Sequence, residues 1–422
     1  MNLPLAFRPV DSRAARSALL LGSFFFLCAT AGRLSAKPSF TGLGNPLGGD
    51  GTRAVALAAG RPLVVGISLD HTSMFTAQRS FRWSPQDGAT DLGQLPGAAV
   101  TLADRISPTG SVITGTSETR QGRGYSEQAF RWTREEGIVA IPLPPGTATG
   151  NSILALSDDG AVLTGIADSV AFCWTRAGGS QSLGVVAGEI YSIATGISAD
   201  GRIIVGQSGR AGTIEAFRWT QEEGMRGIGF LPGSNENDEV FISADGNVIV
   251  GTAFFDQLTP QQTGQVFRWT ARTGMVALPF PPGQGYGEAH AVSADGITIV
   301  GEGRLSGSTT VRQAFRWTLE GGMEDLGFLP GGGDLSLATG VSADGSKVVG
   351  HSDSIDGVVQ MFLWTERDGI RSVRDVLVED YGLKLDGWTL VSGMISADGR
   401  SLAGNGINPA GQDEAWFAHL GD

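Results

Sequence analysis

Short runs of β-branched and aromatic residues, separated by glycine-rich turns, alternate along nearly the whole chain. The ten residues Ile197–Gly206, ISADGRIIVG, return as ISADGNVIVG, VSADGITIVG and VSADGSKVVG. In each copy an Asp-Gly pair lies between two such runs, and Asp-Gly can occupy the positive-φ positions that a tight hairpin turn requires. The pattern therefore predicts an antiparallel hairpin at every copy.

A second motif recurs in phase with the first. It reads SFRWS at 80, AFRWT at 129, AFCWT at 171, AFRWT at 216, VFRWT at 266, AFRWT at 314 and MFLWT at 361. After each copy a polar loop closes on glycine and an apolar run resumes, which predicts a second hairpin. Four antiparallel strands in a repeat of about 48 residues match a propeller blade, whereas the three-and-four apolar spacing of helical repeats is absent.

The two ends of the repeat region are offset by one strand. Residues 40–68 align without a gap on residues 324–352, so this region begins with the fourth strand of a repeat. It stops at EAWFAHLGD, a third strand with no fourth strand after it. The sequence thus predicts an all-β, eight-bladed β-propeller of four-stranded antiparallel blades, whose ring is closed by the N-terminal strand.

The first 36 residues have a different composition. Three arginines precede the apolar run ALLLGSFFFLCATA, and small residues follow it at Ala29-Thr30-Ala31 and Leu34-Ser35-Ala36. This order is typical of a cleaved secretory signal, and the run is too short to span a membrane. We therefore expect residues 1–36 to be a signal peptide and 37–422 to be a single β-propeller domain that is secreted or periplasmic.

The net charge narrows the classes of partner, and the cysteine content indicates whether a disulfide can form. The chain has a net charge of −13, and residues 1–36 contribute +3, so the exported part carries −16. Such a surface repels nucleic acid phosphates and anionic lipids, and we expect neither nucleic acid binding nor membrane insertion. Cys28 leaves with the signal peptide, so Cys173 is alone and no internal disulfide is expected.

The paired motifs AFRWT and VSADGxxVVG resemble the HAF-type extracellular repeat family over nearly all of residues 40–422. The resemblance implies an exported, β-propeller-like bacterial repeat protein, and it brings no established catalytic residues. Three units depart from the pattern. Gly60-Arg61 and Thr109-Gly110 replace Asp-Gly, and Phe417-Ala418 stands where other units have Arg-Trp.

The repeated residues are predicted to have structural rather than catalytic or binding roles. The tryptophans share one strand face with the preceding phenylalanines, which predicts a core between blades. The arginine between them becomes Cys173 and Leu363 in two units, so its charge is not required at that position. Aspartate before glycine suits a turn without calcium. Ser352 in GHSDS occupies a common strand ending, which argues against a nucleophile elbow.

No motif for cofactor or metal chemistry is present. The four histidines are scattered without HExxH spacing, and no phosphate-binding glycine pattern is found. The tryptophan repeat of quinone-binding propellers is also not found. We therefore predict no catalytic residue, no metal ion and no cofactor.

Candidate binding residues lie where the repeats disagree, in the connections after VVG and after LPG, which share one face of an up-and-down propeller. An aromatic ring beside amides and carboxylates suits a sugar or a peptide. The predicted ligand-binding residues are Tyr125, Glu127, Asn235, Asp238, Phe254, Phe255, Asp256, Tyr286 and His290.

Three function classes stay open. We expect an exported binding or scaffolding module whose partner is an extracellular glycan or an envelope protein. The alternative is a hydrolase or lyase acting on polysaccharide, with two carboxylates among Asp238, Asp256 and Glu288 as acid and base. A structural filler of the extracellular matrix would show no saturable ligand.

Overall fold

The hairpins that the repeat predicts are present as sheets of four antiparallel strands. The computed structural model describes residues 37–421, apart from 71–77, 122–123, 149, 256–262, 282, 306–307 and 309. The predicted signal peptide, residues 1–36, lies outside the described residues. The described chain is all-β and propeller-like, except for one short helical segment. No helix in it is long and apolar enough to cross a membrane.

Blades 1 to 4 follow one another along the chain. Blade 1 contains β2 (Gly51–Leu57), β3 (Val64–Leu69), β4 (Arg79–Ser84) and β5 (Gly88–Asp91). Blade 2 contains β6 (Val100–Ile106), β7 (Ile113–Gln121), β8 (Gly124–Thr133) and β9 (Gly137–Ala140). Blade 3 contains β10 (Asn151–Leu156), β11 (Val162–Ala167), β12 (Val170–Thr175) and β13 (Gly179–Gly184). Blade 4 contains β14 (Tyr191–Ile197), β15 (Ile204–Arg210), β16 (Thr213–Thr220) and β17 (Gly224–Gly227).

Blades 5 to 8 complete the described sheets. Blade 5 contains β18 (Ser234–Ile242), β19 (Ile249–Phe255), β20 (Thr263–Thr270) and β21 (Gly274–Ala277), and one parallel bridge joins β18 to β16. Blade 6 contains β22 (Gln284–Val292), β23 (Thr298–Leu305), β24 (Arg312–Thr318) and β25 (Gly322–Gly327). Blade 7 contains β26 (Ser336–Val341), β27 (Lys347–Ser352), β28 (Gln360–Thr365) and β29 (Gly369–Ser372). Blade 8 contains β30 (Thr389–Ile395), β31 (Ser401–Ile407), β32 (Asp413–His419) and β1 (Ser39–Gly42).

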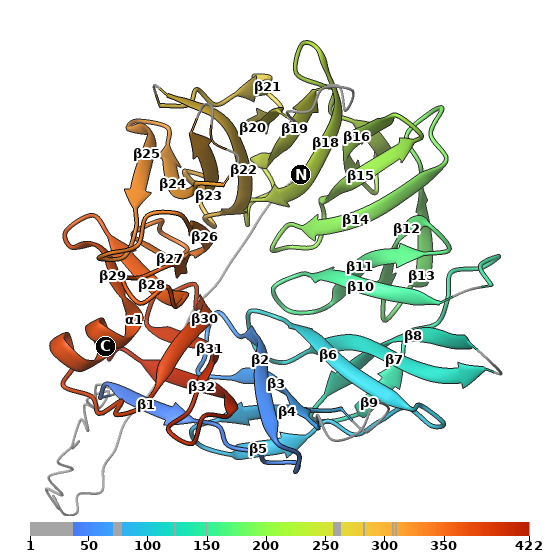
Figure 1. The fold of residues 1–422 in the computed structure, drawn as a ribbon. Helices are drawn as coiled ribbons and strands as arrows, with labels where there is room; N and C mark the ends of the chain where they lie inside the picture. The colour runs from blue at the N-terminus through green and yellow to red at the C-terminus, as the bar shows by residue number, and fades with distance from the viewer. Residues whose placement is uncertain are drawn as a thin grey trace, which may run out of the picture. The chain divides into compact units, whose positions relative to one another are not determined.

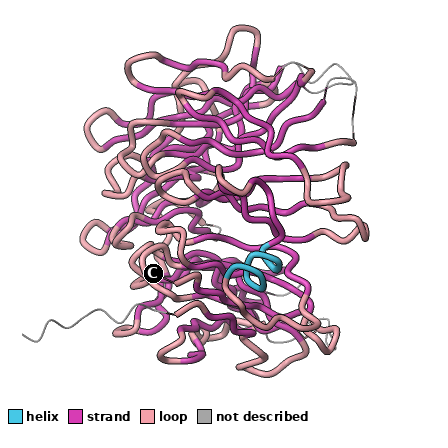
Figure 2. The backbone as a smooth tube through the Cα atoms, turned by 90° about the vertical axis from the view of Figure 1, so that its left-hand side faces the viewer, coloured by secondary structure: helices cyan, strands magenta, loops and turns pink. Residues whose placement is uncertain are grey.

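The first strand of each blade is the innermost one. Each of β2, β6, β10, β14, β18, β22 and β26 contacts the first strand of the next blade, and β30 contacts β2. Figure 1 shows these strands nearest the centre, with the second, third and fourth strands successively farther out. In the side view the strands run between two faces on which the loops gather (Figure 2).

The Asp-Gly turns are built by hydrogen bonds within the turn. In the copy at Ser198–Gly201, the Gly201 N–H donates to the Ser198 carbonyl at 2.9 Å, and Gly201 has φ +74°. The Asp200 carboxylate accepts from the Ser198 hydroxyl at 2.7 Å and from the Arg202 N–H at 3.0 Å. These bonds lower the pKa of Asp200. The predicted turn role of this aspartate is confirmed, although only the glycine takes a positive φ.

Backbone hydrogen bonds join the turns of neighbouring blades. The Asp158 N–H donates to the Ala199 carbonyl, the Ala199 N–H to the Ala244 carbonyl, and the Ala244 N–H to the Ala294 carbonyl, at 2.8–3.0 Å. These three bonds link four successive turns, so they help to fix the positions of blades 3 to 6 relative to one another at this face.

The tryptophan of each FRW motif packs at the interface between blades, as predicted. Trp317 of blade 6, for example, belongs to a buried cluster with Val248 and Val250 of blade 5. In three blades the preceding arginine covers the tryptophan of the following blade, as Arg82 does at 5.8 Å from the Trp132 ring centre. This position needs a side chain that covers an aromatic ring, which explains why some units dispense with its charge.

Strand β1 is the outermost strand of blade 8. It pairs antiparallel with β32, and Phe40 contacts Trp388 and Trp416 with ring centres 5.2 Å and 6.0 Å apart. Across the junction with blade 1, Phe417 lies 5.3 Å from the Trp83 ring centre. Phe417 occupies the position of the motif arginine, so this departure from the repeat preserves the aromatic contact between blades.

A helical segment that the sequence analysis did not predict links blades 7 and 8. It consists of α1 (Val373–Asp375) and the π-helical η1 (Val376–Asp380), drawn in cyan in Figure 2. Leu377 is fully buried against blade 8, and Arg371 pairs with Glu379 and Asp380 at 2.8 Å and 2.7 Å.

Deleting residues 37–46 tests the contribution of β1. The deletion removes the pairing with β32 and the Phe40 contacts, so we expect the free energy of unfolding to fall by about 3–5 kcal/mol. Thermal melts followed by circular dichroism would measure the loss. A matched deletion of residues 37 and 38 keeps β1 intact and should melt like the parent protein. Equal melting of both deletions would contradict a stabilising role for this strand.

Candidate ligand-binding site on blades 5 and 6

A β-bulge interrupts the innermost strand of every blade. In seven blades the strand register shifts at one equivalent place, and the unpaired residues are Val55, Asp104, Leu154, Thr195, Glu239 with Val240, His290 and Thr339. In blade 8 the register shifts nearer the start of the strand, at Val391. A bulge re-aims the side chain that it carries, and bulges are common next to functional sites. The residue at this place is apolar in some blades and charged in others, so the bulge is where the repeats differ chemically.

The bulge of β18 is wider than the others. It leaves both Glu239 and Val240 unpaired, and Val240 fills the buried position that small alanines occupy in several other blades. Glu239 has φ +52°, a left-handed conformation that is uncommon for residues other than glycine. The extra residue therefore moves the Glu239 carboxylate out of the core between blades.

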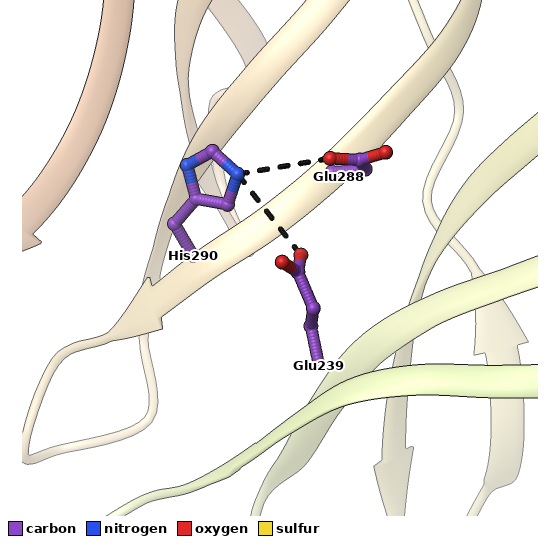
Figure 3. Close-up of side chains that lie close together, drawn as sticks. All are labelled: Glu239, Glu288 and His290. Atoms are coloured by element: carbon purple, nitrogen blue, oxygen red, sulfur yellow. Dashed lines mark ion pairs between the residues drawn. The ribbon is translucent and has the colours of Figure 1, made fainter.

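Glu239, Glu288 and His290 meet at these bulges. The His290 Nε2 atom lies 3.9 Å from an oxygen of Glu288 and 4.0 Å from an oxygen of Glu239. Figure 3 shows the imidazole ring directed toward both carboxylates, one from its own strand β22 and one from β18. The other ring nitrogen, Nδ1, lies 3.1 Å from the Ala338 carbonyl oxygen of blade 7. Three consecutive blades thus define the position of this ring.

A buried glutamate on the next strand supports the cluster. Glu302 of β23 pairs directly with Glu288, and its side chain is 1% exposed. Arg312 and Arg304 lie 3.4 Å and 3.9 Å from one of its oxygens, and the Arg304 guanidinium stacks 4.0 Å from the centre of the Tyr286 ring. The arginines offset the like charges of two glutamates that face each other across a strand pair.

The electrostatics of the cluster favour bound protons. Burial raises the pKa of Glu239 to about 7, and the negative charge of Glu288 adds to the rise. Burial alone would lower the pKa of His290, but the carboxylates of Glu288 and Glu239 outweigh it, so the pKa of His290 is raised. His351 on β27 shows the opposite result, because burial lowers its pKa and the charge of His290 adds to that effect. A proton or another cation is therefore favoured between the carboxylates and His290.

Several predicted ligand residues lie on the strands that carry this cluster, β18 and β22, or on β19, which pairs with β18. Tyr286 and His290 are on β22, Asn235 and Asp238 are on β18, and Phe254 and Phe255 end β19. Their placement corrects the expectation that they belong to loops, because β18, β19 and β22 extend into the variable connections. Asp256 lies outside the described residues.

Two predicted residues belong to a different blade. Tyr125 and Glu127 lie on β8 of blade 2, where Glu127 pairs with Glu118 of β7 and is exposed. The structure therefore divides the predicted set between blade 2 and blades 5 and 6.

Sequence reasoning missed Glu239 and Glu302. Aligning the repeats on the serine of the turn motif would have found Glu239, since Ala54, Ala103 and Ala194 stand at that place in other units. Glu302 follows the glycine of the VVG motif, where other units have Ile67, Gln207 or His351. The signal for both residues was a charge inside a repeated strand.

Buried oxygen atoms without hydrogen-bond donors concentrate on the same strands. On β18, β22 and β23 six side-chain oxygens of this kind belong to Asn235, Asn237, Glu239, Gln284 and Glu302, the last with two. Among the remaining described residues, carboxylate or amide oxygens of this kind are found at Asp104 and Glu189. Because such acceptors are costly to bury, a ligand that offers donors or positive charge would be stabilised here.

Comparisons with known proteins establish the fold alone. No protein-family model matches the chain, and no curated protein matches it. A prolyl endopeptidase structure is 11% identical with a TM-score of 0.52, covering 85% of this chain and 55% of that one. An oligogalacturonate lyase in complex with manganese is 13% identical with a TM-score of 0.49, covering 86% and 98%. TolB from Acinetobacter baumannii is 13% identical with a TM-score of 0.39, covering 85% and 82%.

Proton titration by NMR tests the electrostatics of the cluster. We expect the pKa of His290 to lie above 6.5 and that of His351 to lie below 6.5. Since the folded-state pKa of His290 is raised, its proton stabilises the fold below pH 6.5, and this stabilisation is lost as the pH rises through the folded-state pKa.

Substituting Glu239→Gln should lower the pKa of His290, because a negative charge beside the ring is removed. Glu127→Gln, in blade 2, is the matched control and should leave that pKa unchanged. An unchanged pKa of His290 in the Glu239→Gln protein would contradict the pairing.

Proposed function

We propose that this chain is an exported, closed eight-bladed propeller that binds a hydroxyl-rich ligand, an extracellular glycan, on blades 5 and 6. The closure proposal is supported by three observations at one junction. Strand β1 pairs with β32, β30 contacts β2, and a buried cluster joins Val64 and Phe81 of blade 1 to Ala415 and Phe417 of blade 8. A latch of this kind joins the two ends of a propeller ring.

The binding proposal rests on one observation, the concentration of buried acceptors without donors on β18, β22 and β23. Sugar hydroxyls donate hydrogen bonds to amide and carboxylate oxygens, and an aromatic ring can cover the apolar face of a sugar. Asn235 and Phe254 lie on the same hairpin of blade 5 as Glu239, which gives the site both kinds of contact. The net charge of the chain favours a neutral or cationic glycan over an anionic one.

Export and family membership are part of the proposal. Residues 1–36 have the composition of a secretory signal, and the paired AFRWT and VSADGxxVVG motifs resemble HAF-type extracellular repeats. Together they support a binding surface at the cell envelope or outside the cell. An envelope protein is the alternative partner at the same location.

A polysaccharide-active enzyme is the second candidate function, and one observation favours it. The pKa of Glu239 is raised to about 7, so at neutral pH this carboxyl is partly protonated, as a general acid requires. An oxygen of Glu239 lies within 4.8 Å of an oxygen of Glu288, and retaining glycosidases hold two carboxyl groups about 5 Å apart. The sequence analysis had already considered Glu288 as a catalytic carboxylate, but it had not considered Glu239.

Co-sedimentation distinguishes the two candidates. The purified protein is mixed with envelopes and exopolysaccharide of its host, and the supernatant is assayed for depleted protein and for released sugars. Saturable depletion without sugar release is the result that we expect of a binding module. Time-dependent release that survives further purification, and that disappears in Glu239→Gln, would instead support the enzyme.

Single substitutions locate the binding surface. We expect Asn235→Ala and Phe254→Ala to weaken binding at least about fivefold, because each removes roughly 1 kcal/mol of ligand contact. The melting temperature should change little, since Asn235 gives up one exposed hydrogen bond, to the Gly212 carbonyl. Phe255 is a poorer choice, since it packs against the buried cluster around Leu231 and Val240. Glu127→Ala in blade 2 is the control, and a loss of binding confined to that variant would move the site to blade 2.

A further inference from the structure

Three metal-ligand atoms converge at the bulges of blades 5 and 6. One carboxylate oxygen each from Glu239 and Glu288 and one ring nitrogen of His290 all lie within 4.8 Å of one another. They come from two strands of neighbouring blades, so their approach is a feature of the tertiary fold. The distances of 3.9 Å and 4.0 Å from Nε2 are too long for direct hydrogen bonds.

The hydrogen bond on the far side of the imidazole fixes which nitrogen is available. The Ala338 carbonyl can only accept, so the proton lies on Nδ1 of His290, 3.1 Å away. In the neutral ring, Nε2 therefore presents a lone pair toward the two carboxylates. Histidine ligands of metal ions commonly donate their other N–H to a backbone carbonyl in this way, which orients the ring.

Glu239 is held in an unfavourable state. Its φ of +52° is one that glycine adopts more easily, and its Oε2 atom is buried without a hydrogen-bond donor. Neither the backbone conformation nor the buried oxygen stabilises the fold. A bound cation would compensate for both by accepting the Oε2 lone pair.

The buried side chain of Glu302 is a second, independent observation that favours a bound cation. Its side chain is 1% exposed, neither of its carboxylate oxygens accepts a hydrogen bond, and it faces Glu288 across the strand pair. Arg304 and Arg312 offset this charge from the side of β23 and β24. When Glu239, Glu288 and Glu302 are ionised, their three negative charges outnumber the two arginines, so the cluster attracts a cation to the first two carboxylates.

We propose that Glu239, Glu288 and His290 bind one divalent first-row transition metal ion, of which Zn²⁺ is the representative. One imidazole and two carboxylates form a ligand set suited to such ions, whereas Ca²⁺ and Mg²⁺ prefer sites made of oxygen alone. Three protein ligands leave coordination positions open for water or for a ligand hydroxyl. The proposal does not depend on glycan binding, since the ion is held by the chain itself.

Isothermal titration of the purified, chelator-treated protein with ZnCl₂ tests the site. We expect one equivalent of Zn²⁺ to bind with a Kd on the order of 10 µM or tighter. Glu288→Gln and His290→Gln should each weaken binding at least about tenfold. Asp104→Asn changes the bulge residue of blade 2 and should leave the affinity unchanged. Absence of saturable binding, or full affinity in His290→Gln, would overturn the proposal.

Glu239→Gly separates loss of the site from loss of the fold. Glycine suits a φ of +52°, so this variant should melt at the same temperature as the parent or higher and still lose Zn²⁺ affinity at least tenfold. Mn²⁺ gives a second readout, because it should broaden the ring resonances of His290 and leave those of His419 sharp. Undiminished Zn²⁺ binding by Glu239→Gly would exclude the three-residue site.

Co-sedimentation repeated with EDTA distinguishes this proposal from glycan binding. If the glycan still binds after the metal is removed, the two proposals stand separately. If Zn²⁺ fails to bind while the glycan is retained, the metal proposal alone is overturned.

Discussion

The fold depends on a close approach that only glycine permits. In blade 6, Gly301 of β23 lies opposite Phe315 of β24 on one side and Ala289 of β22 on the other. A Cβ on Gly301 would meet the Glu288 carbonyl oxygen at 1.9 Å and the Phe315 ring at 3.0 Å. The missing side chain therefore lets the innermost strand bend over the second strand, and lets the aromatic ring of the third strand pack beneath it. A Cβ on Gly115, Gly206 or Gly350 would likewise meet the backbone of the innermost strand, at 1.8–2.0 Å.

The same contact explains why a repetitive scaffold carries a local site. Bending the innermost strand over glycine produces the bulge, and the bulge exposes one residue that is not required for packing. In most blades this residue is apolar or carries a hydroxyl. In blades 5 and 6 it is Glu239 and His290, so two ionisable groups meet across a junction that also contains the widest bulge. The chemistry of this junction therefore comes from the side chains at the bulge positions, which the packing between blades does not fix.

The sequence predicted the scaffold because each structural requirement recurs about eight times. The FRW tryptophans, the Asp-Gly turns and the position of β1 each follow from a pattern that several units share. The residues of the site, by contrast, follow no pattern that several units share. The polar segment SNENDE reads as a loop, yet it forms β18 because it pairs with β19, and its charges are tolerated by the wide bulge at Glu239. The helical segment at Val373–Asp380 occurs once and therefore left no repeated signal.

The stability of the fold and the chemistry of the site are carried by different residues. The packing between blades 5 and 6 comes from Val248, Val250 and Trp317, none of which belongs to the charged cluster. Glu239 and Glu302, by contrast, bury carboxylate oxygens that accept no hydrogen bond, and Glu239 also holds an unfavourable backbone conformation. A chain with many similar interfaces between blades can sustain one locally strained junction, because the other interfaces are built independently of it. The left-handed residue Glu239 lies where three potential ligand atoms converge, so ligand binding there would offset its cost.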